Sequence, residues 1–242
     1  MIDLHCHLLH EMDDGAQSLS EAVEMCRIAE MNNISHICLT SHFEDFSQID
    51  AFLNRRAEKF KQLKAELESR DIFVELSLGA EVAAMDGLMT CNRLPELALN
   101  NSRYLLLEFP FEFTPRHELF DYIKKVSGAG LIPVIAHPER FSYIQSDLDI
   151  LEELSLHNVL IQVNATSLLG EWGGRVRKAA SVLLENDWIH VIASDAHSVN
   201  GRNNDMLQFA SMLSDYLSDD QLTMVMDTIP KAILDNVEIT FA

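Results

Sequence analysis

The residues best suited to chemistry in this 242-residue sequence are histidines and carboxylates, and the first pair stands near its beginning. His5 and His7 end a short apolar segment that starts at Met1 and is typical of a β-strand. Residues i and i+2 of a strand point to the same side, so both imidazoles could bind one metal ion while Cys6 faces away. An isolated pair of this kind is also compatible with ordinary surface or core histidines, so the later motifs must decide.

Side chains that can bind a metal also follow most of the later apolar segments. They are His42 at the end of 35–42, Glu81 after 72–78, Glu108 after 104–107, His137 after 131–136, and Asp195 and His197 after 188–193. The segment 159–163 is the exception, because it ends at Asn164. Asp14, in the loop after the first strand, could reach the same place. Because the carboxyl ends of parallel strands share one face of a barrel, we expect these side chains to meet in one site.

Five histidines and four carboxylates would provide enough ligands for two or three divalent ions with a bridging carboxylate. Mixed imidazole and carboxylate ligands suit manganese, iron or zinc better than calcium, and magnesium is a further candidate. Taken singly, each residue could be a surface carboxylate or a structural histidine, but their joint placement favours a metal site. We expect structural or surface roles for the remaining histidines, which are His10, His36, His117, His157 and His190.

Two arginines follow the predicted ligands closely. Arg140 comes shortly after His137, and Arg202 comes shortly after His197. A guanidinium at the mouth of the site could bind phosphate oxygens through two parallel hydrogen bonds, which lysine cannot do. Ordinary surface salt bridges are the alternative for both residues. Arg175, which follows two glycines, is a weaker third candidate.

Strand and helix patterns alternate about seven times along the chain. The expected helices are 18–31, 47–70, 114–128, 147–156 and 173–186, with short helical turns in 82–101 and a C-terminal cover at 206–217 and 220–227. Ser18 and Glu21 resemble a capping box, Pro115 suits the first position of its helix, and Asp147 suits an N-cap. We therefore predict an α/β protein with a parallel sheet, open or closed, in one domain spanning 1–242.

The composition excludes several classes of protein. The net charge of −20 would repel a nucleic acid, and a 48% hydrophobic fraction with 23% charged residues is typical of a globular protein. No run of 18 apolar residues and no signal peptide is evident, so we expect a cytoplasmic protein without membrane insertion. The four cysteines form no Cys-x-x-Cys motif, and none has the arginine that a cysteine-dependent phosphatase requires six residues later.

The motifs together resemble the polymerase-and-histidinol-phosphatase (PHP) superfamily. The resemblance rests on Ile2–His7, Asp13–Gly15, Thr40–His42, Gly79–Glu81, Leu107–Phe109, Ala136–Arg140 and Ala193–His197. More narrowly, the chain is similar to bacterial manganese-dependent protein-tyrosine phosphatases of capsule and exopolysaccharide synthesis. The resemblance implies a distorted (β/α)7 TIM-like barrel, a manganese centre, and hydrolysis of phosphotyrosine on an autophosphorylating bacterial tyrosine kinase.

The resemblance also implies how the ligands divide among three ions. One ion would take His5, His7, Glu81 and Asp195; a second would share Glu81 with Glu108 and His137; a third would take Asp14, His42 and His197. The chain departs from its relatives at Val82–Ala84, where aromatic residues are common, and at Asn203–Asn204, where prolines are expected. Both departures would lie at the rim of the site and concern substrate preference.

The predicted chemistry is metal-assisted hydrolysis of a phosphomonoester, with Arg140 and Arg202 neutralising the phosphoryl oxygens. A phenolate leaving group, with a pKa of about 10, needs little protonation, so no general acid is assigned. Three alternatives remain open. They are a small-molecule phosphatase acting on a substrate such as histidinol phosphate, a nuclease of the same superfamily, and a non-catalytic partner that regulates a kinase.

Overall fold

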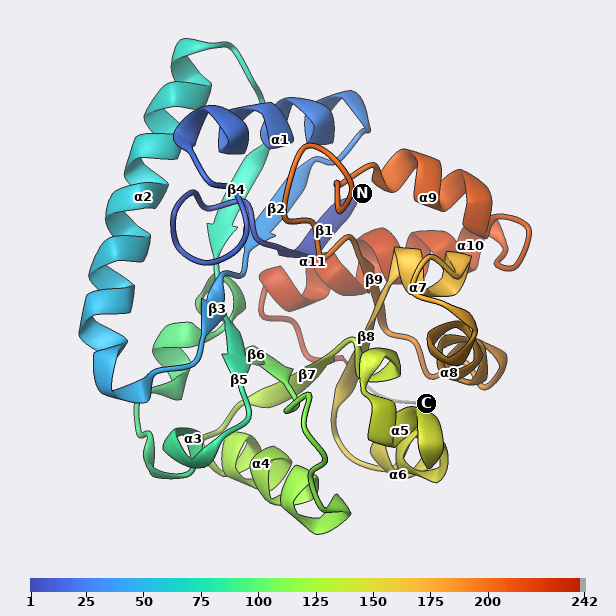
Figure 1. Ribbon diagram of the computed structural model, residues 1–242. Coiled ribbons are helices and arrows are strands. Elements are labelled where there is room, and N and C mark those ends of the chain that lie inside the picture. The colour runs from blue at the N-terminus through green and yellow to red at the C-terminus, as the bar shows by residue number, and fades with distance from the viewer. Residues whose placement is uncertain (240–242) are drawn as a thin grey trace.

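Nine short parallel strands form the centre of the computed structural model, which describes residues 1–239 (Figure 1). They are β1 (Ile2–Cys6), β2 (His36–Leu39), β3 (His42–Phe43), β4 (Glu75–Leu78), β5 (Glu81–Ala83), β6 (Tyr104–Glu108), β7 (Ile132–Ala136), β8 (Leu160–Asn164) and β9 (Val191–Ala193). One sheet has the order β1-β2-β4, and the other has the order β3-β5-β6-β7-β8-β9.

Two of the predicted strands are interrupted rather than continuous. The segment 35–42 is divided into β2 and β3, and the strand predicted at 72–78 begins later, as β4, and is followed by the separate strand β5. His42 and Glu81 therefore begin new strands instead of following old ones. Backbone hydrogen bonds carry the pairing across the breaks, since Thr40 N donates to Cys6 O at 3.0 Å and Gly79 N donates to Leu39 O at 2.9 Å. Counted as two broken strands, these pieces give the seven strand positions that the sequence predicts.

The ring closes between β1 and the residues after β9. Asp195 N donates to His5 O at 2.9 Å, and His7 N donates to Ala196 O at 2.8 Å. Ser194 adds a side-chain link, because its hydroxyl donates to Asp3 Oδ2 at 2.6 Å. On the opposite side, β6 pairs with β5, whereas β4 contacts the 3-10 helix Leu99–Asn101. The predicted α/β fold, a distorted parallel barrel, is confirmed. The distortion lies between β4 and β6, which belong to different sheets.

Helices surround the strands, with α1, α2, α4 and α8 on successive sides (Figure 1). Their bounds are α1 (Leu19–Met31), α2 (Ile49–Ser69), α3 (Asp86–Thr90), α4 (Arg116–Gly128), α5 (Ser142–Ser146), α6 (Asp149–Ser155), α7 (Ala165–Leu169), α8 (Gly174–Glu185), α9 (Met206–Leu213), α10 (Asp219–Thr223) and α11 (Ile229–Leu234). The one-turn π-helix Met224–Thr228 joins α10 to α11. Among the described residues, no helix is long and apolar enough to cross a lipid bilayer.

Three local predictions about helix starts need correction. Ser18 caps α1 as expected, but Glu21 accepts from Gln17 N, so the capping box is only half formed. Pro115 is the N-cap of α4 and not its first residue. The helix predicted to start at Asp147 starts after Leu148, because the preceding residues form the additional helix α5.

An apolar floor lies beneath the carboxyl ends of the strands. Leu106 and Leu160 precede Glu108 and Asn164 by two and four residues on the same strands, so strand alternation places each on the same side as its polar partner, and Val191 begins β9 beside them. These three leucine and valine side chains are buried in one apolar cluster, which α11 completes with Ile233 and Leu234. The polar groups above are therefore held on a close-packed base that excludes water.

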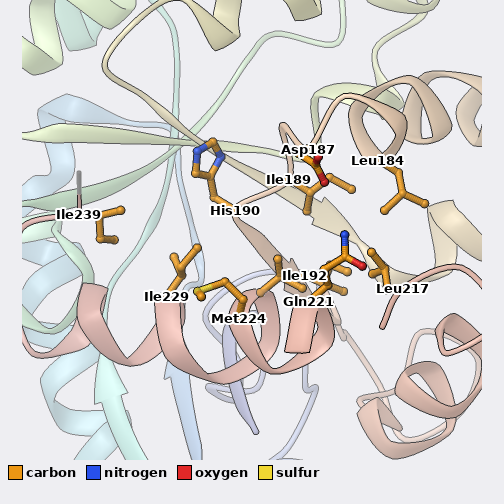
Figure 2. Close-up of a pocket in the computed structure, with 11 residues that line it drawn as sticks. Leu184, Asp187, Ile189, His190, Ile192, Leu217, Gln221, Met224, Ile229 and Ile239 are labelled. Carbon is orange, nitrogen blue, oxygen red and sulfur yellow. The ribbon is translucent and has the colours of Figure 1, made fainter. Parts of the chain in front are cut away.

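A separate cavity of about 260 Å³ lies at the other end of the barrel, where the strands begin. Figure 2 shows its lining, in which Ile189, His190 and Ile192 face Met224 and Ile229. None of the predicted site residues lines this cavity. The cavity is therefore distinct from the site at the carboxyl ends.

Candidate metal centre

The predicted ligand residues converge at the carboxyl ends of the strands. Nε2 of His5 and Nε2 of His7 lie 3.0 Å apart, which confirms that the two imidazoles face the same side. Each of these nitrogens lies 3.1 Å from Glu81 Oε2. Each also lies 3.5 Å from Asp195 Oδ1. The end of β1, the start of β5 and the residues after β9 therefore supply the innermost part of the site.

The other predicted ligands surround this inner group. Glu81 Oε2 lies 3.0 Å from His42 Nδ1, and Glu81 Oε1 lies 2.9 Å from His137 Nε2. Glu108 Oε1 is 3.6 Å from the same His137 nitrogen. Asp14 Oδ1 lies 3.3 Å from His197 Nε2 and 3.6 Å from His42 Nε2. All nine residues thus belong to one cluster, with Glu81 at its centre.

Burial distinguishes the floor of the site from its mouth. The side chains of His5, His7 and Glu81 are fully buried. The Asp14 side chain is 68% exposed, and that of His42 is 25% exposed. A substrate would therefore approach from the side of Asp14 and His42.

Four overlapping groups of side chains could each hold a metal ion, with their ligand atoms within 4.8 Å of one another. The groups are His7, Asp14, His42 and His197; His5, His7 and Glu81; His5, His137 and Asp195; and His42, Glu81 and Glu108. Glu81 belongs to two groups, as a bridging carboxylate would. His137 groups with His5 and Asp195, which differs from the division that the family resemblance implies.

Asp13 orients the inner histidine and was not among the predicted site residues. His7 Nδ1 lies 2.9 Å from Asp13 Oδ2, which also accepts from His42 N at 2.8 Å. Burial raises the pKa of Asp13, but its hydrogen bond and charge interaction with His7 outweigh burial and lower it to about 2. Gly15 is required here because a Cβ would collide with the carbonyl oxygen of His7. The ionised Asp13 therefore keeps the proton of His7 on Nδ1 and turns Nε2 toward the cluster.

The donor set fits a divalent metal ion. Glu81 Oε2, His42 Nδ1 and His197 Nε2 are buried and have no hydrogen-bond partner in the described part of the chain. His197 Nδ1 faces the carbonyl oxygen of Asp195 at 2.9 Å, so its Nε2 lone pair points into the cluster. Lone pairs and carboxylate oxygens converging without donors repel one another, and a cation removes this repulsion.

The pKa values show how strongly the groups influence one another. Burial raises the pKa of Glu108 to about 8, and the neighbouring Glu81 carboxylate contributes to the same shift. Burial and the adjacent His7 lower the pKa of His197 to about 4. Burial would also raise the pKa of Glu81, but the charge of His5 and the close contacts of His137 and His42 outweigh burial and lower its pKa well below the usual range. Burial would raise the pKa of Asp195 as well, but the nearby His5, His137 and His7 outweigh it and lower the pKa, so the cluster contains two firmly ionised carboxylates, Glu81 and Asp195.

Both predicted arginines reach this cluster. Arg140 Nη1 lies 2.9 Å from Asp195 Oδ2, and Arg202 Nη2 lies 2.7 Å from the same oxygen. They line the mouth together, so neither is an isolated surface ion pair. Arg175 is exposed near the start of α8, and no described hydrogen bond or ion pair connects it to these groups.

An exposed tryptophan supports both arginines, and sequence analysis missed it. The Arg140 guanidinium carbon lies 4.6 Å from the Trp172 ring centre, and that of Arg202 lies 5.6 Å from it. Arg140 also lies 5.6 Å from the ring centre of Phe111. Trp172 Nε1 donates to Thr166 Oγ1 at 2.9 Å, which fixes the indole. The only sequence signal was its place in a loop that follows an apolar strand.

Two of the histidines for which the sequence predicts structural or surface roles have partners away from the cluster. His36 bonds Ser77 Oγ at 2.9 Å, near the start of β2. His10 bonds Gln62 Oε1 at 3.1 Å. Their structural roles agree with the expectation from the sequence.

A parallel barrel with clustered imidazoles and carboxylates at its carboxyl end is typical of metal-dependent barrel hydrolases. The sequence model of the family described as capsular polysaccharide synthesis, CpsB/CapC, matches residues 1–235, and the chain belongs to this family.

Two relatives show the extent of this similarity. The chain is 32% identical over 245 residues to the putative tyrosine-protein phosphatase CapC of Staphylococcus aureus, covering 96% of this chain and 94% of the relative. It is 35% identical over 207 residues to the tyrosine-protein phosphatase YwqE of Bacillus subtilis, covering 84% and 80%. The family-level resemblance predicted from the motifs is therefore confirmed.

Comparison with solved structures agrees with this family assignment and with the fold. A structure from a study of YwqE from Bacillus subtilis and CpsB from Streptococcus pneumoniae, described as metal-dependent tyrosine phosphatases, matches with a TM-score of 0.84 and 31% identity. The match covers 99% of this chain and 96% of the other. A TatD-like protein from Archaeoglobus fulgidus matches with a TM-score of 0.53 and 13% identity over 96% of this chain and 99% of the other, which supports the fold alone.

Proposed function

We propose that this protein is a metal-dependent phosphatase that hydrolyses phosphotyrosine in a protein substrate. The observation that carries the proposal is that two arginines share Asp195 Oδ2 while Asp195 Oδ1 faces His5 and His7. Phosphate-binding cations and candidate metal ligands thus meet at one carboxylate. The names of the relatives as tyrosine-protein phosphatases support the same conclusion.

We assign metal binding to the cluster as a whole. Its members are His5, His7, Asp14, His42, Glu81, Glu108, His137, Asp195 and His197. Manganese is the proposed ion, in two or three copies, because the mixed nitrogen and oxygen donors suit it; iron, zinc and magnesium are the alternatives. Such ions, when bound, lower the pKa of water from 15.7 to about 7 and neutralise phosphoryl charge.

The protein's own residues bind and orient the phosphoryl group. Arg140 and Arg202 would exchange a hydrogen bond to Asp195 for bonds to the equatorial oxygens of a bound phosphoryl group. Their attachment to Asp195 keeps both side chains at the mouth before substrate arrives. This preorganisation reduces the entropy lost when the substrate binds.

Exposed aromatic rings near Arg140 favour an aryl phosphate. Trp172 is 39% exposed and Phe111 is 53% exposed, and both rings contact the Arg140 guanidinium. A phenol ring could stack beside them while its phosphate meets the arginines. Histidinol phosphate, the small-molecule alternative, has no phenol ring that could use these surfaces in the same way.

The proposed partner is an autophosphorylating bacterial tyrosine kinase that regulates capsule or exopolysaccharide synthesis. Membership in the capsular polysaccharide synthesis family supports this assignment. We further propose a cytoplasmic location, which agrees with four free cysteines. The net charge of −20 disfavours a nucleic acid as substrate.

The test compares substrates on one metal-stripped preparation with manganese restored. Phosphate release is measured from a tyrosine phosphopeptide and from histidinol phosphate, and cleavage of single-stranded DNA is followed by the length of the fragments. The proposal predicts manganese-dependent release that is fastest from the phosphopeptide. Faster release from histidinol phosphate would favour the small-molecule phosphatase, cleavage of DNA would favour the nuclease, and capture of a kinase without turnover would favour a non-catalytic partner.

A further inference from the structure

Strand β8 provides no candidate metal ligand, yet it carries two buried amides. Gln162 is fully buried and Asn164 is 1% exposed. They are two residues apart on one strand, so both point to the same side. On a strand otherwise composed of Leu, Ile and Val, two adjacent buried amides are costly unless each hydrogen bond is made.

The backbone determines the direction of these hydrogen bonds. His137 N donates to Gln162 Oε1 at 3.2 Å, and because a peptide N–H can only donate, this end of the amide is the oxygen. Gln162 Nε2 must then be the other end, and it donates to Asn164 Oδ1 at 2.8 Å. Asn164 Nδ2 in turn donates to Asp195 Oδ2 at 2.7 Å. The chain of donors therefore has one sense, from β7 through β8 to the residues after β9.

The same oxygen of Gln162 determines the protonation of His5. His5 Nδ1 lies 3.0 Å from Gln162 Oε1, which can only accept. Nδ1 must therefore carry the proton that forms this hydrogen bond. The Nε2 lone pair of the neutral ring then faces His7, Glu81 and Asp195 Oδ1.

We propose that Gln162 and Asn164 are positioning residues that prepare His5 and Asp195 as metal ligands. Gln162 selects the Nδ1–H tautomer of His5, and Asn164 holds Oδ2 of Asp195 so that Oδ1 faces the cluster. The strand without a ligand thus sets the geometry of ligands on two other segments, as outer-shell partners do at metal sites. This inference rests on the proposed metal centre but does not depend on which phosphoester is the substrate.

Manganese affinity is the first test and needs no substrate. Manganese is titrated calorimetrically into metal-stripped wild type and into Gln162→Met, which keeps the volume and removes both polar ends. We expect affinity to fall by about 10- to 100-fold, as for other outer-shell residues. Gln62→Met is the matched control, because Gln62 also accepts from a histidine, His10, away from the cluster. Equal loss in both variants, or no loss in Gln162→Met, would overturn the proposal.

A double-mutant cycle tests whether the two amides act as one unit. Asn164→Ala should lower manganese affinity, and the Gln162→Met/Asn164→Ala protein should lose little more than the stronger single variant. Full additivity would show two independent contacts and contradict a directed chain.

The tautomer of His5 is a third measurement, and it would not change if Gln162 only filled space. Nitrogen-15 spectra of the metal-stripped protein at high pH, assigned with His5→Asn, should place the His5 proton on Nδ1. In Gln162→Met the ring should populate both tautomers. An unchanged Nδ1–H tautomer in that variant would refute the role of Gln162. If the wild type shows no phosphatase activity but Gln162→Met still binds manganese more weakly than the wild type, this inference stands and the proposed function is overturned. If the wild type is an active phosphatase but Gln162→Met binds manganese as tightly as the wild type, the proposed function stands and this inference is overturned.

Discussion

At the carboxyl end of the barrel, His7 gives one nitrogen to Asp13 and turns the other toward Glu81. Burial alone would lower the pKa of His7, but these two carboxylates outweigh it and raise the pKa well above its usual range. At the amino end, His190 lines an apolar cavity and its Nδ1 accepts from Ile161 N at 3.1 Å (Figure 2). Burial there lowers the pKa of His190 to about 4.

The difference shows that burial alone does not make a histidine a candidate ligand. A carboxylate or amide oxygen must hold the proton on one ring nitrogen, and a shared polar space must face the other. His5 and His7 meet both conditions, whereas His190 is half-buried and its Nδ1 accepts a hydrogen bond from Ile161 N, so no oxygen holds a proton on that nitrogen. Substitutions at the two ends should therefore have separate consequences, on metal binding at one end and on folding stability at the other.

The largest effect is expected for Glu81→Gln. Glu81 contacts four histidines, so loss of its charge should weaken metal binding by more than the roughly 100-fold of outer-shell changes. Manganese titration and phosphopeptide hydrolysis both measure this. Glu75→Gln, at the exposed first residue of β4, is the control and should match wild type. Retained affinity in Glu81→Gln would remove this residue from the metal centre.

Arg140→Lys should reduce kcat/KM by about 10²- to 10³-fold, because lysine keeps the charge but loses the bidentate fork. Metal content should stay close to that of wild type. Arg175→Lys is the matched control, since Arg175 lies exposed outside the described contacts of the cluster. Equal activity in both variants would contradict a phosphate-binding role for Arg140.

Asp13→Asn should lower manganese affinity by about 10- to 100-fold. The amide lacks the charge that keeps the proton on His7 Nδ1, although it still fills the same space. Calorimetric titration checks this, with Asp45→Asn as a control at an exposed 3-10 helix cap. An unchanged affinity would show that His7 needs no orienting carboxylate.

Trp172→Leu should weaken binding of an aryl phosphate by roughly tenfold, since cation–π contacts to two arginines are worth about 0.5–1 kcal/mol each at exposed sites. KM and the inhibition constant of phenylphosphonate are the measurements. Trp172→Phe retains a ring face and should lose less. Identical losses in the two variants would indicate that the indole acts by bulk alone.

The smallest effect concerns stability at the amino end. The folded-state pKa of His190, about 4, lies below its ordinary value of 6.5, so the stability of the neutral ring is present above pH 6.5 and lost toward pH 4. Between pH 7 and pH 6 the loss should stay below about 1 kcal/mol. Urea unfolding of wild type and His190→Phe at several pH values measures it. An equal pH dependence in both proteins would exclude His190 as the source.

The candidate ligands were predictable because they follow short-range rules. Alternation along one strand places His5 beside His7, and parallel strands bring their carboxyl ends together whatever the loops between them. The family motifs then indicated the barrel.

The supporting residues were not predictable, because their roles depend on contacts between distant parts of the chain. Gln162 acts through His5, 157 residues away, and Trp172 supports arginines on two other loops. The breaks after β2 and β4 were also missed, because the change of pairing partner at these points is a tertiary effect. Asp13 could have been predicted from the sequence, because it adjoins the predicted ligand Asp14.

The most direct test of the central claim is a manganese titration of metal-stripped protein during phosphopeptide hydrolysis, run beside His5→Ala/His7→Ala. We expect phosphate release to rise with two or three equivalents of manganese, and the double variant to show neither tight binding nor release. Phosphate release that needs no metal, or that survives in the double variant, would contradict it.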